Sequence, residues 1–142
     1  MTTPLFRLLA AASLGLLLIG TTACDKASPT PEKASSALLA GHWELTYTTG
    51  GLAGGTQPAD PSRKQAIVFT SAGQSSILLN GTVISSSPFT LTQAPAITGR
   101  AETFVTYATG STISSFINKL LTNELVLTEN VYDGFDLHYT RR

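Results

Sequence analysis

The sequence predicts an all-β domain of about eight short antiparallel strands. Residues 36–142 are rich in Thr, Ser, Val, Ile and Tyr, which favour strands. Turn-forming residues recur at intervals of about 8–12 residues, a spacing typical of a β-sandwich or a β-barrel. Apolar and polar residues alternate between several of these turns, as in strands with one buried face.

The first strand is predicted over residues 42–49, where the alternation is clearest. One face carries Trp43, Leu45 and Tyr47, and the other carries His42, Glu44, Thr46 and Thr48. Residues 50–61, GGLAGGTQPADP, are expected to form a long flexible loop. A second strand follows over residues 63–70, with Ile67 and Phe69 on the inner face.

The middle of the domain is predicted to contain a tight hairpin. Residues 75–80 and 82–86 flank Asn80-Gly81, a pair that suits the positive φ angles of a two-residue turn. A fifth strand is expected over residues 89–93 and a sixth over residues 101–109.

Residues 111–122 allow two interpretations. Their apolar residues lie at helical spacing: Ile113, Phe116, Ile117, Leu120 and Leu121. The same segment contains Thr112, Ser114 and Ser115, and two clear strands follow it, so we favour a strand as far as about residue 118. Residues 124–129 and 135–140 then form a hairpin around Asp133-Gly134.

Residues 1–23 are predicted to be a secretory signal peptide. Arg7 precedes an apolar run over residues 8–19 that is shorter than the ~20 residues a membrane-spanning helix needs. Small residues then lead directly to Cys24, the only cysteine. A plain secreted protein with a leftover thiol is the alternative, although an odd cysteine in an oxidising compartment invites intermolecular pairing.

The segment Gly20-Thr-Thr-Ala-Cys24 resembles the lipobox of bacterial lipoproteins, with Thr21 where Leu is usual. That resemblance implies that Cys24 is acylated, as with palmitate, and anchors the chain to a membrane of the bacterial cell envelope. It leaves open the periplasmic face or the cell surface. After Cys24, residues 25–35 contain two prolines and four charges, a composition that cannot bury a core. Residues 24–35 are therefore expected to be a disordered tether.

Gly41-His-Trp43 at the first strand resembles the opening motif of lipocalins. The segments LLAGHWELTYTTGG, AIVFTSAGQ and NELVLTENVYDGFDLHYTRR are similar to the lipocalin-like domains of small bacterial lipoproteins, over residues 36–142. The resemblance implies an eight-stranded antiparallel up-and-down barrel, with a β-sandwich as the alternative. Gly41 and Trp43 would close one end, with Arg141 or Arg142 stacked on the indole. It also implies that residues 50–61 either cover the barrel mouth or form an ordinary loop.

The same resemblance implies non-enzymatic binding of a small apolar or amphipathic ligand. The candidates for the ligand-lining or core positions are Leu45, Tyr47, Ile67, Phe69, Phe89, Leu91, Leu125, Leu127, Leu137 and Tyr139. The same side chains could equally fill the barrel. The protein would then be a rigid surface or periplasmic module that contacts another envelope protein and holds no ligand.

Other functions find little support in the sequence. The formal net charge is zero and no basic run is present, so nucleic acid is not an expected partner. The chain has no Gly-x-Ser-x-Gly and no HExxH, and we predict no catalytic residue, no enzyme activity and no cofactor. A zinc site could form on neighbouring first and last strands from His42, Glu44, Asp136 and His138. Polar residues on a solvent face explain them better, so no metal site is predicted.

Overall fold

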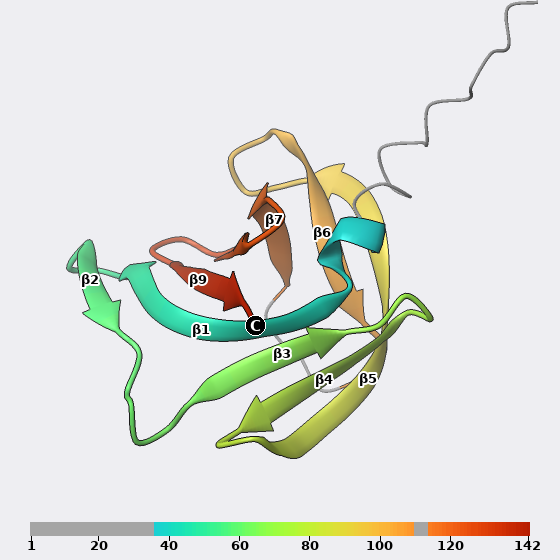
Figure 1. The fold of residues 1–142 in the computed structure, drawn as a ribbon. Coiled ribbons are helices and arrows are strands. Elements are labelled where there is room, and N and C mark those ends of the chain that lie inside the picture. The colour runs from blue at the N-terminus through green and yellow to red at the C-terminus, as the bar shows by residue number, and fades with distance from the viewer. Residues whose placement is uncertain (1–35, 110–113) are drawn as a thin grey trace, which may run out of the picture.

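The computed structural model describes residues 36–109 and 114–142, which form one closed antiparallel barrel (Figure 1). Eight strands close the barrel through pairing of the first with the last, and one extra strand lies at its edge. This confirms the all-β class and decides for the barrel over the sandwich. The strands are β1 (Gly41–Gly50), β2 (Gly55–Pro58), β3 (Gln65–Phe69), β4 (Gln74–Leu79), β5 (Thr82–Pro95), β6 (Ala101–Tyr107), β7 (Ser115–Leu120), β8 (Glu124–Glu129) and β9 (Phe135–Arg141).

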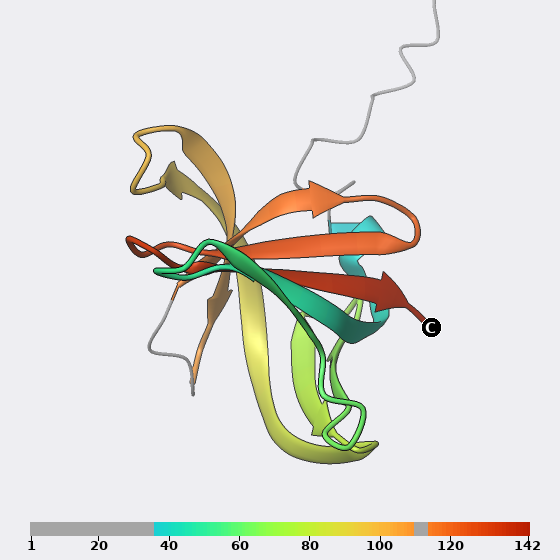
Figure 2. The same cartoon turned by 90° about the vertical axis from the view of Figure 1, so that its left-hand side faces the viewer.

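The extra strand β2 lies within the segment that was expected to be a loop. The second half of β1 pairs with β2 and the first half with β3, while β9 pairs along the other edge of β1. Gly50, Gly51 and Gly54 have φ angles of 104°, 71° and 61°, and they allow the chain to reverse between β1 and β2. The prediction of a long loop was therefore wrong for residues 55–58, which form a hairpin with the second half of β1 (Figure 2).

A β-bulge in β1 changes which side chains point inward. Leu45 lies opposite Tyr139, but the register then shifts, and Tyr47 lies opposite His138. The ring of Tyr47 stacks on that of His138 with centroids 4.1 Å apart. Strict alternation had placed Tyr47 on the same face as Trp43. The extra residue at the bulge turns Tyr47 to the opposite face, so its expected place in the core or ligand wall was wrong.

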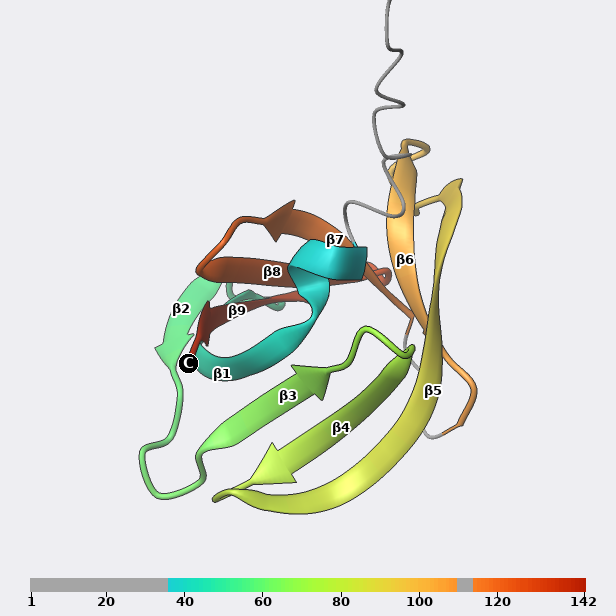
Figure 3. The ribbon, with the colours of Figure 1, turned by 45° about the vertical axis from the view of Figure 1, so that its right-hand side comes forward.

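Strand β5 replaces two predicted strands, over residues 82–86 and 89–93. Its first half pairs with β4 and its second half with β6, and the strand curves around one side of the barrel (Figure 3). Pro88 lies where β5 changes partner. A proline cannot donate to a ladder, and this junction between two pairings is where its missing N–H is tolerated.

The two predicted hairpin turns are present. Asn80 and Gly81 have φ angles of 52° and 81°. They form the two-residue turn that joins β4 to β5. The Asn80 side chain also accepts a hydrogen bond from the Lys64 backbone N–H at 2.9 Å. Asp133, with φ of 53°, lies in the turn between β8 and β9.

Residues 111–122 had allowed a strand or a helix. Their described part, residues 114–122, contains a strand and no helix. Residues 110–113 lie outside the described residues, and β7 continues to Leu120, beyond the predicted end. The register of β7 against β8 shifts between Ile117 and Lys119. Because of this bulge, Ile117 and Leu120 both pack against the core although they are three residues apart. The helical spacing in the sequence therefore reflects a bulged strand.

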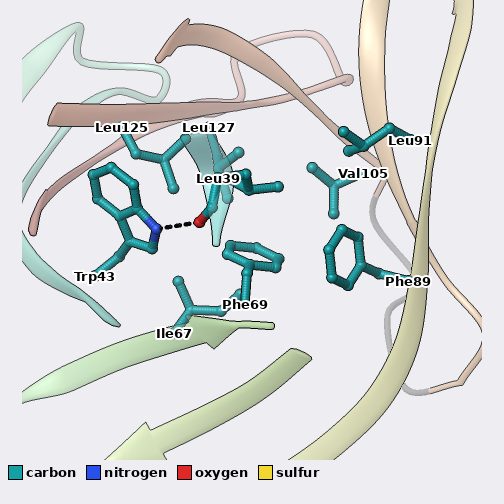
Figure 4. Packing of buried hydrophobic residues seen from close by; sticks show 9 residues of the cluster. All are labelled: Leu39, Trp43, Ile67, Phe69, Phe89, Leu91, Val105, Leu125 and Leu127. Atoms are coloured by element: carbon teal, nitrogen blue, oxygen red, sulfur yellow. Dashed lines mark hydrogen bonds between the residues drawn. The ribbon is translucent and has the colours of Figure 1, made fainter. Parts of the chain in front are cut away.

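The core occupies one end of the barrel. Nine buried residues form it: Leu39, Trp43, Ile67, Phe69, Phe89, Leu91, Val105, Leu125 and Leu127 (Figure 4). The rings of Phe69 and Phe89 pack edge to face with centroids 4.9 Å apart. A smaller buried cluster of Ala96, Phe104 and Phe116 lies apart from it. In the described part of the chain, no helix is long and apolar enough to cross a membrane.

Candidate functional site

Trp43 closes one end of the barrel. Its side chain has no exposed surface, and its indole N–H donates a hydrogen bond of 2.7 Å to the carbonyl of Leu39 (Figure 4). Leu39 is also fully buried and lies in the helical turn, residues 36–39, that precedes β1. A buried indole N–H needs an acceptor, and this turn supplies it from only four residues away.

Arg141 covers the indole. Its guanidinium carbon lies 4.2 Å from the centroid of Trp43. The same guanidinium donates to the carbonyls of Ala40 at 2.7 Å, Thr122 at 2.5 Å and Leu38. It thus ties together the turn before β1, the turn between β7 and β8, and the end of β9.

Arg142, the other candidate for barrel closure, lies away from the indole. It forms a bidentate ion pair with Glu44, with N–O distances of 2.8 and 3.2 Å. The hydrogen bond from Arg142 lowers the pKa of Glu44 below its ordinary value. Of the two terminal arginines, only Arg141 contributes to the closed end.

Gly41 is required by the position of Arg141. Its φ angle is 150°, and a Cβ atom added there would lie 2.2 Å from Nη1 of Arg141. The glycine of the Gly-x-Trp segment therefore provides both a rare backbone conformation and the space for the guanidinium.

A cavity of about 360 Å³ adjoins the packed core, with Ile67 and Leu127 common to both. Its apolar wall includes Ile67, Leu127, Leu137 and the ring of Tyr139, which are four of the ten predicted lining or core residues. Phe69, Phe89, Leu91 and Leu125 belong to the packed core and do not line the cavity. Leu45 is partly buried and, like Tyr47, lines neither region.

The sequence interpretation missed the polar part of the cavity wall. It consists of Gln65, Ser75, Ser85, Ser86, Ser87, Tyr107, Thr109, Ser115 and Glu129. A signal for some of these residues was present. Ser85 and Ser87 continue the inward alternation of Phe89 and Leu91 along β5, and Glu129 continues that of Leu125 and Leu127 along β8.

The buried serines of the cavity are paired within the protein. Ser75 and Ser87 are 3% and 5% exposed, and the Ser75 hydroxyl donates to the Ser87 carbonyl at 2.9 Å. The Ser87 hydroxyl donates to the Pro88 carbonyl at 3.0 Å and accepts from the Thr109 backbone N–H at 3.0 Å. These hydroxyls hold β4, β5 and the end of β6 together, so they offer little capacity for a ligand.

The two cavity tyrosines differ from these serines. Neither the Tyr107 nor the Tyr139 hydroxyl has a hydrogen-bond partner among the described residues. Burial raises the pKa of Tyr107 to about 12. Burial also raises the pKa of Tyr139, and the nearby Tyr107 and Glu129 raise it further. Both phenols are neutral near pH 7, and each can donate and accept a hydrogen bond inside the cavity.

The structure does not assemble the zinc site that the outer strands suggested. Within residues 36–109 and 114–142, no group of three metal-ligating side chains comes together. Glu44 pairs with Arg142, and Asp136 accepts a hydrogen bond from the Thr128 hydroxyl. Nε2 of His138 lies 3.2 Å from the Thr49 hydroxyl.

The barrel interior is thus the candidate functional site, with a sealed end at Trp43 and a partly polar cavity that adjoins the core. Comparison with known protein families, with curated proteins and with solved structures gave no match for this chain.

Proposed function

We propose that the protein is a lipid-anchored, lipocalin-like binding protein of the bacterial cell envelope. It holds a small amphipathic molecule in its barrel and does not transform it chemically. Three features support this proposal: the lipobox-like segment at Cys24, the Gly-x-Trp start of the first strand, and a closed eight-stranded barrel that contains a cavity.

The cavity is the observation that carries the proposal. An eight-stranded barrel can be filled by its own side chains or can hold one small ligand. The volume of about 360 Å³ is in the lower part of the ~300–1,000 Å³ range of ligand pockets. An apolar cavity of ~150 Å³ already accepts benzene. The space therefore suits a molecule of one or two rings, or a short chain with a polar end.

The lining supports binding without catalysis. The cavity wall has one carboxylate, Glu129, and its described residues include no His, Cys, Lys or Asp. Nucleophilic catalysis needs a nucleophile and a base within hydrogen-bond reach of each other. The Ser75 and Ser87 hydroxyls donate instead to backbone carbonyls.

A rigid interaction module is the second candidate, and a different surface favours it. The β1–β2 and β8–β9 turns meet through a hydrogen bond of 3.2 Å from the Gly51 N–H to the Gly134 carbonyl. These turns expose large apolar side chains, with Leu52 93% and Tyr132 84% exposed. Such a group of exposed side chains is a typical contact surface for another protein.

Native mass spectrometry can decide between the two functions. The full chain would be extracted from a bacterial host in a mild detergent and released intact in the spectrometer. We expect an extra mass that disappears on denaturation, whereas covalent acyl chains on Cys24 persist. The control is Ser85→Phe, which places a ring in the cavity from an exposed position whose hydroxyl has no partner among the described residues.

The Ser85→Phe variant should lack the extra mass. If the wild-type chain, like this variant, shows only its own bare mass, after incubation with small amphiphiles as well, the ligand-binding proposal is wrong and the interaction module is favoured.

The anchor is tested by fractionation. We expect Cys24→Ser to move the protein from the membrane fraction to the soluble fraction, because acyl chains contribute ~0.8 kcal/mol per buried methylene. Mass analysis of the wild-type chain should show the acyl groups. A variant that remains with the membranes would contradict lipid anchoring through this residue.

A further inference from the structure

We infer that the cavity selects a ligand that carries an amine or another cationic group, which pairs with Glu129 in the cavity that Tyr107 and Tyr139 also line. This inference rests on the proposed ligand-binding function and specifies the chemistry of its ligand.

The charge of the cavity wall is the first argument. Glu129 is the only acidic residue among the described lining residues, and no Lys, Arg or His lines the cavity. In the described part of the chain, Glu129 also forms no salt bridge. A carboxylate in a partly enclosed site without a cation favours a positively charged guest and disfavours an anionic one.

The position of the carboxylate is the second argument. Glu129 ends β8 opposite Ser115, and its Oε2 accepts a hydrogen bond of 3.1 Å from the Phe135 backbone N–H. That bond orients the side chain. Oε1 has no hydrogen-bond partner among the described residues and stays available to a donor on the ligand. An ammonium has donors and no acceptor, which complements a carboxylate oxygen.

The tyrosines supply the third argument. The two tyrosine hydroxyls have no hydrogen-bond partner within residues 36–109 and 114–142, and neither is a buried unpaired atom, so both remain open to a partner in the cavity. Tyr107, Tyr139 and Glu129 all line the same cavity. They supply polar groups to the cavity wall, and Ile67, Ile77, Leu127 and Leu137 provide apolar surface for the rest of the molecule.

Three probes of matched size and different charge test the inference. They are 3-phenylpropylamine, 3-phenylpropan-1-ol and 3-phenylpropanoate, titrated by calorimetry near pH 7 into the full chain in detergent micelles, with empty micelles as the reference. Because the amine gains a charge-assisted hydrogen bond to Glu129, we expect it to bind about tenfold more tightly than the alcohol. The acid should bind most weakly.

Two carboxylate-to-amide variants separate the charge of Glu129 from general effects. Glu129→Gln retains an oxygen for the Phe135 N–H and should reduce amine affinity about tenfold while changing alcohol affinity by less than about threefold. The matched control is Glu102→Gln on β6, a residue that does not line the cavity. This control should bind all three probes as the wild-type chain does.

The outcomes also distinguish this inference from the proposed function. If all three probes bind equally, or if Glu129→Gln leaves the amine unaffected, the charge preference is wrong, while binding that Ser85→Phe abolishes would still support a ligand cavity. If none of the three probes binds, the inference is overturned together with binding of ligands of this size.

Discussion

Arg141 and Arg142 are chemically identical neighbours with different roles. Alternation along a strand sends adjacent side chains to opposite faces. Arg141 therefore reaches the closed end of the barrel, where three carbonyls and the Trp43 ring surround its guanidinium. Arg142 reaches the solvent face, where it pairs with Glu44. The face to which each side chain points therefore decides which of the two arginines stabilises the closed end of the barrel.

Lysine substitutions at these two positions should separate the roles. Arg141→Lys keeps the charge but cannot reproduce a planar group that donates in three directions and stacks on an indole. We expect it to lower the free energy of unfolding by about 1–3 kcal/mol. Arg142→Lys should be close to wild type, because an exposed ion pair contributes little. Urea unfolding followed by Trp43 fluorescence measures both, and equal effects would contradict the assignment of Arg141 to the closed end.

At the scale of elements, bulges explain where the sequence pattern and the structure differ. In β1, the extra residue after Leu45 has no partner of its own in β9. In β7, the extra residue after Ile117 has no partner of its own in β8. One shift moves Tyr47 to the outer face, and the other brings Leu120 inward. No local residue pattern marks either shift, because a bulge depends on how the neighbouring strand curves.

Gly41 at the start of β1 provides a test at this scale. Gly41→Ala places a side chain at a φ of 150° and 2.2 Å from the Arg141 guanidinium. We expect a loss of about 1–3 kcal/mol in the free energy of unfolding.

The matched control for this substitution is Gly55→Ala in β2, where an added Cβ meets no atom within 4 Å. It should be nearly neutral in the same unfolding measurement. A neutral Gly41→Ala variant would show that the guanidinium moves aside without cost.

The whole molecule has two chemically different ends. The chain enters the barrel at the end sealed by Leu39, Trp43 and Arg141. The cavity adjoins the core and reaches the surface near Ile77 and Ser85, both of which line it and are exposed. The turn before β1 thus supports the closed end, and a ligand would enter elsewhere.

High pH should weaken the whole barrel through the cavity tyrosines. The pKa of Tyr107 rises from 10.0 to about 12 on folding, so the unfolded chain loses its phenolic proton first. This contribution to stability is complete below pH 10 and is lost as the pH rises from about 10 to 12. The loss should amount to roughly 2–3 kcal/mol.

Tyr107→Phe should show a smaller decline in the urea midpoint over the same pH range. Lysines that titrate there affect the variant and the wild type alike, so the difference between the two reports on the phenol. Identical declines would contradict the raised pKa of Tyr107.

The sequence by itself determined the local structure of this protein. Alternation and turn chemistry predicted most strands and the Asn80-Gly81 and Asp133-Gly134 turns, because these depend on residues that are adjacent in the chain. Inward alternation also identified Ile67, Leu127, Leu137 and Tyr139, which line the cavity. Only the tertiary structure decided the bulges, the continuity of β5, the choice of Arg141, and the cavity with Glu129 and its two tyrosines. These depend on how distant strands curve and meet around one closed barrel, which no local pattern records.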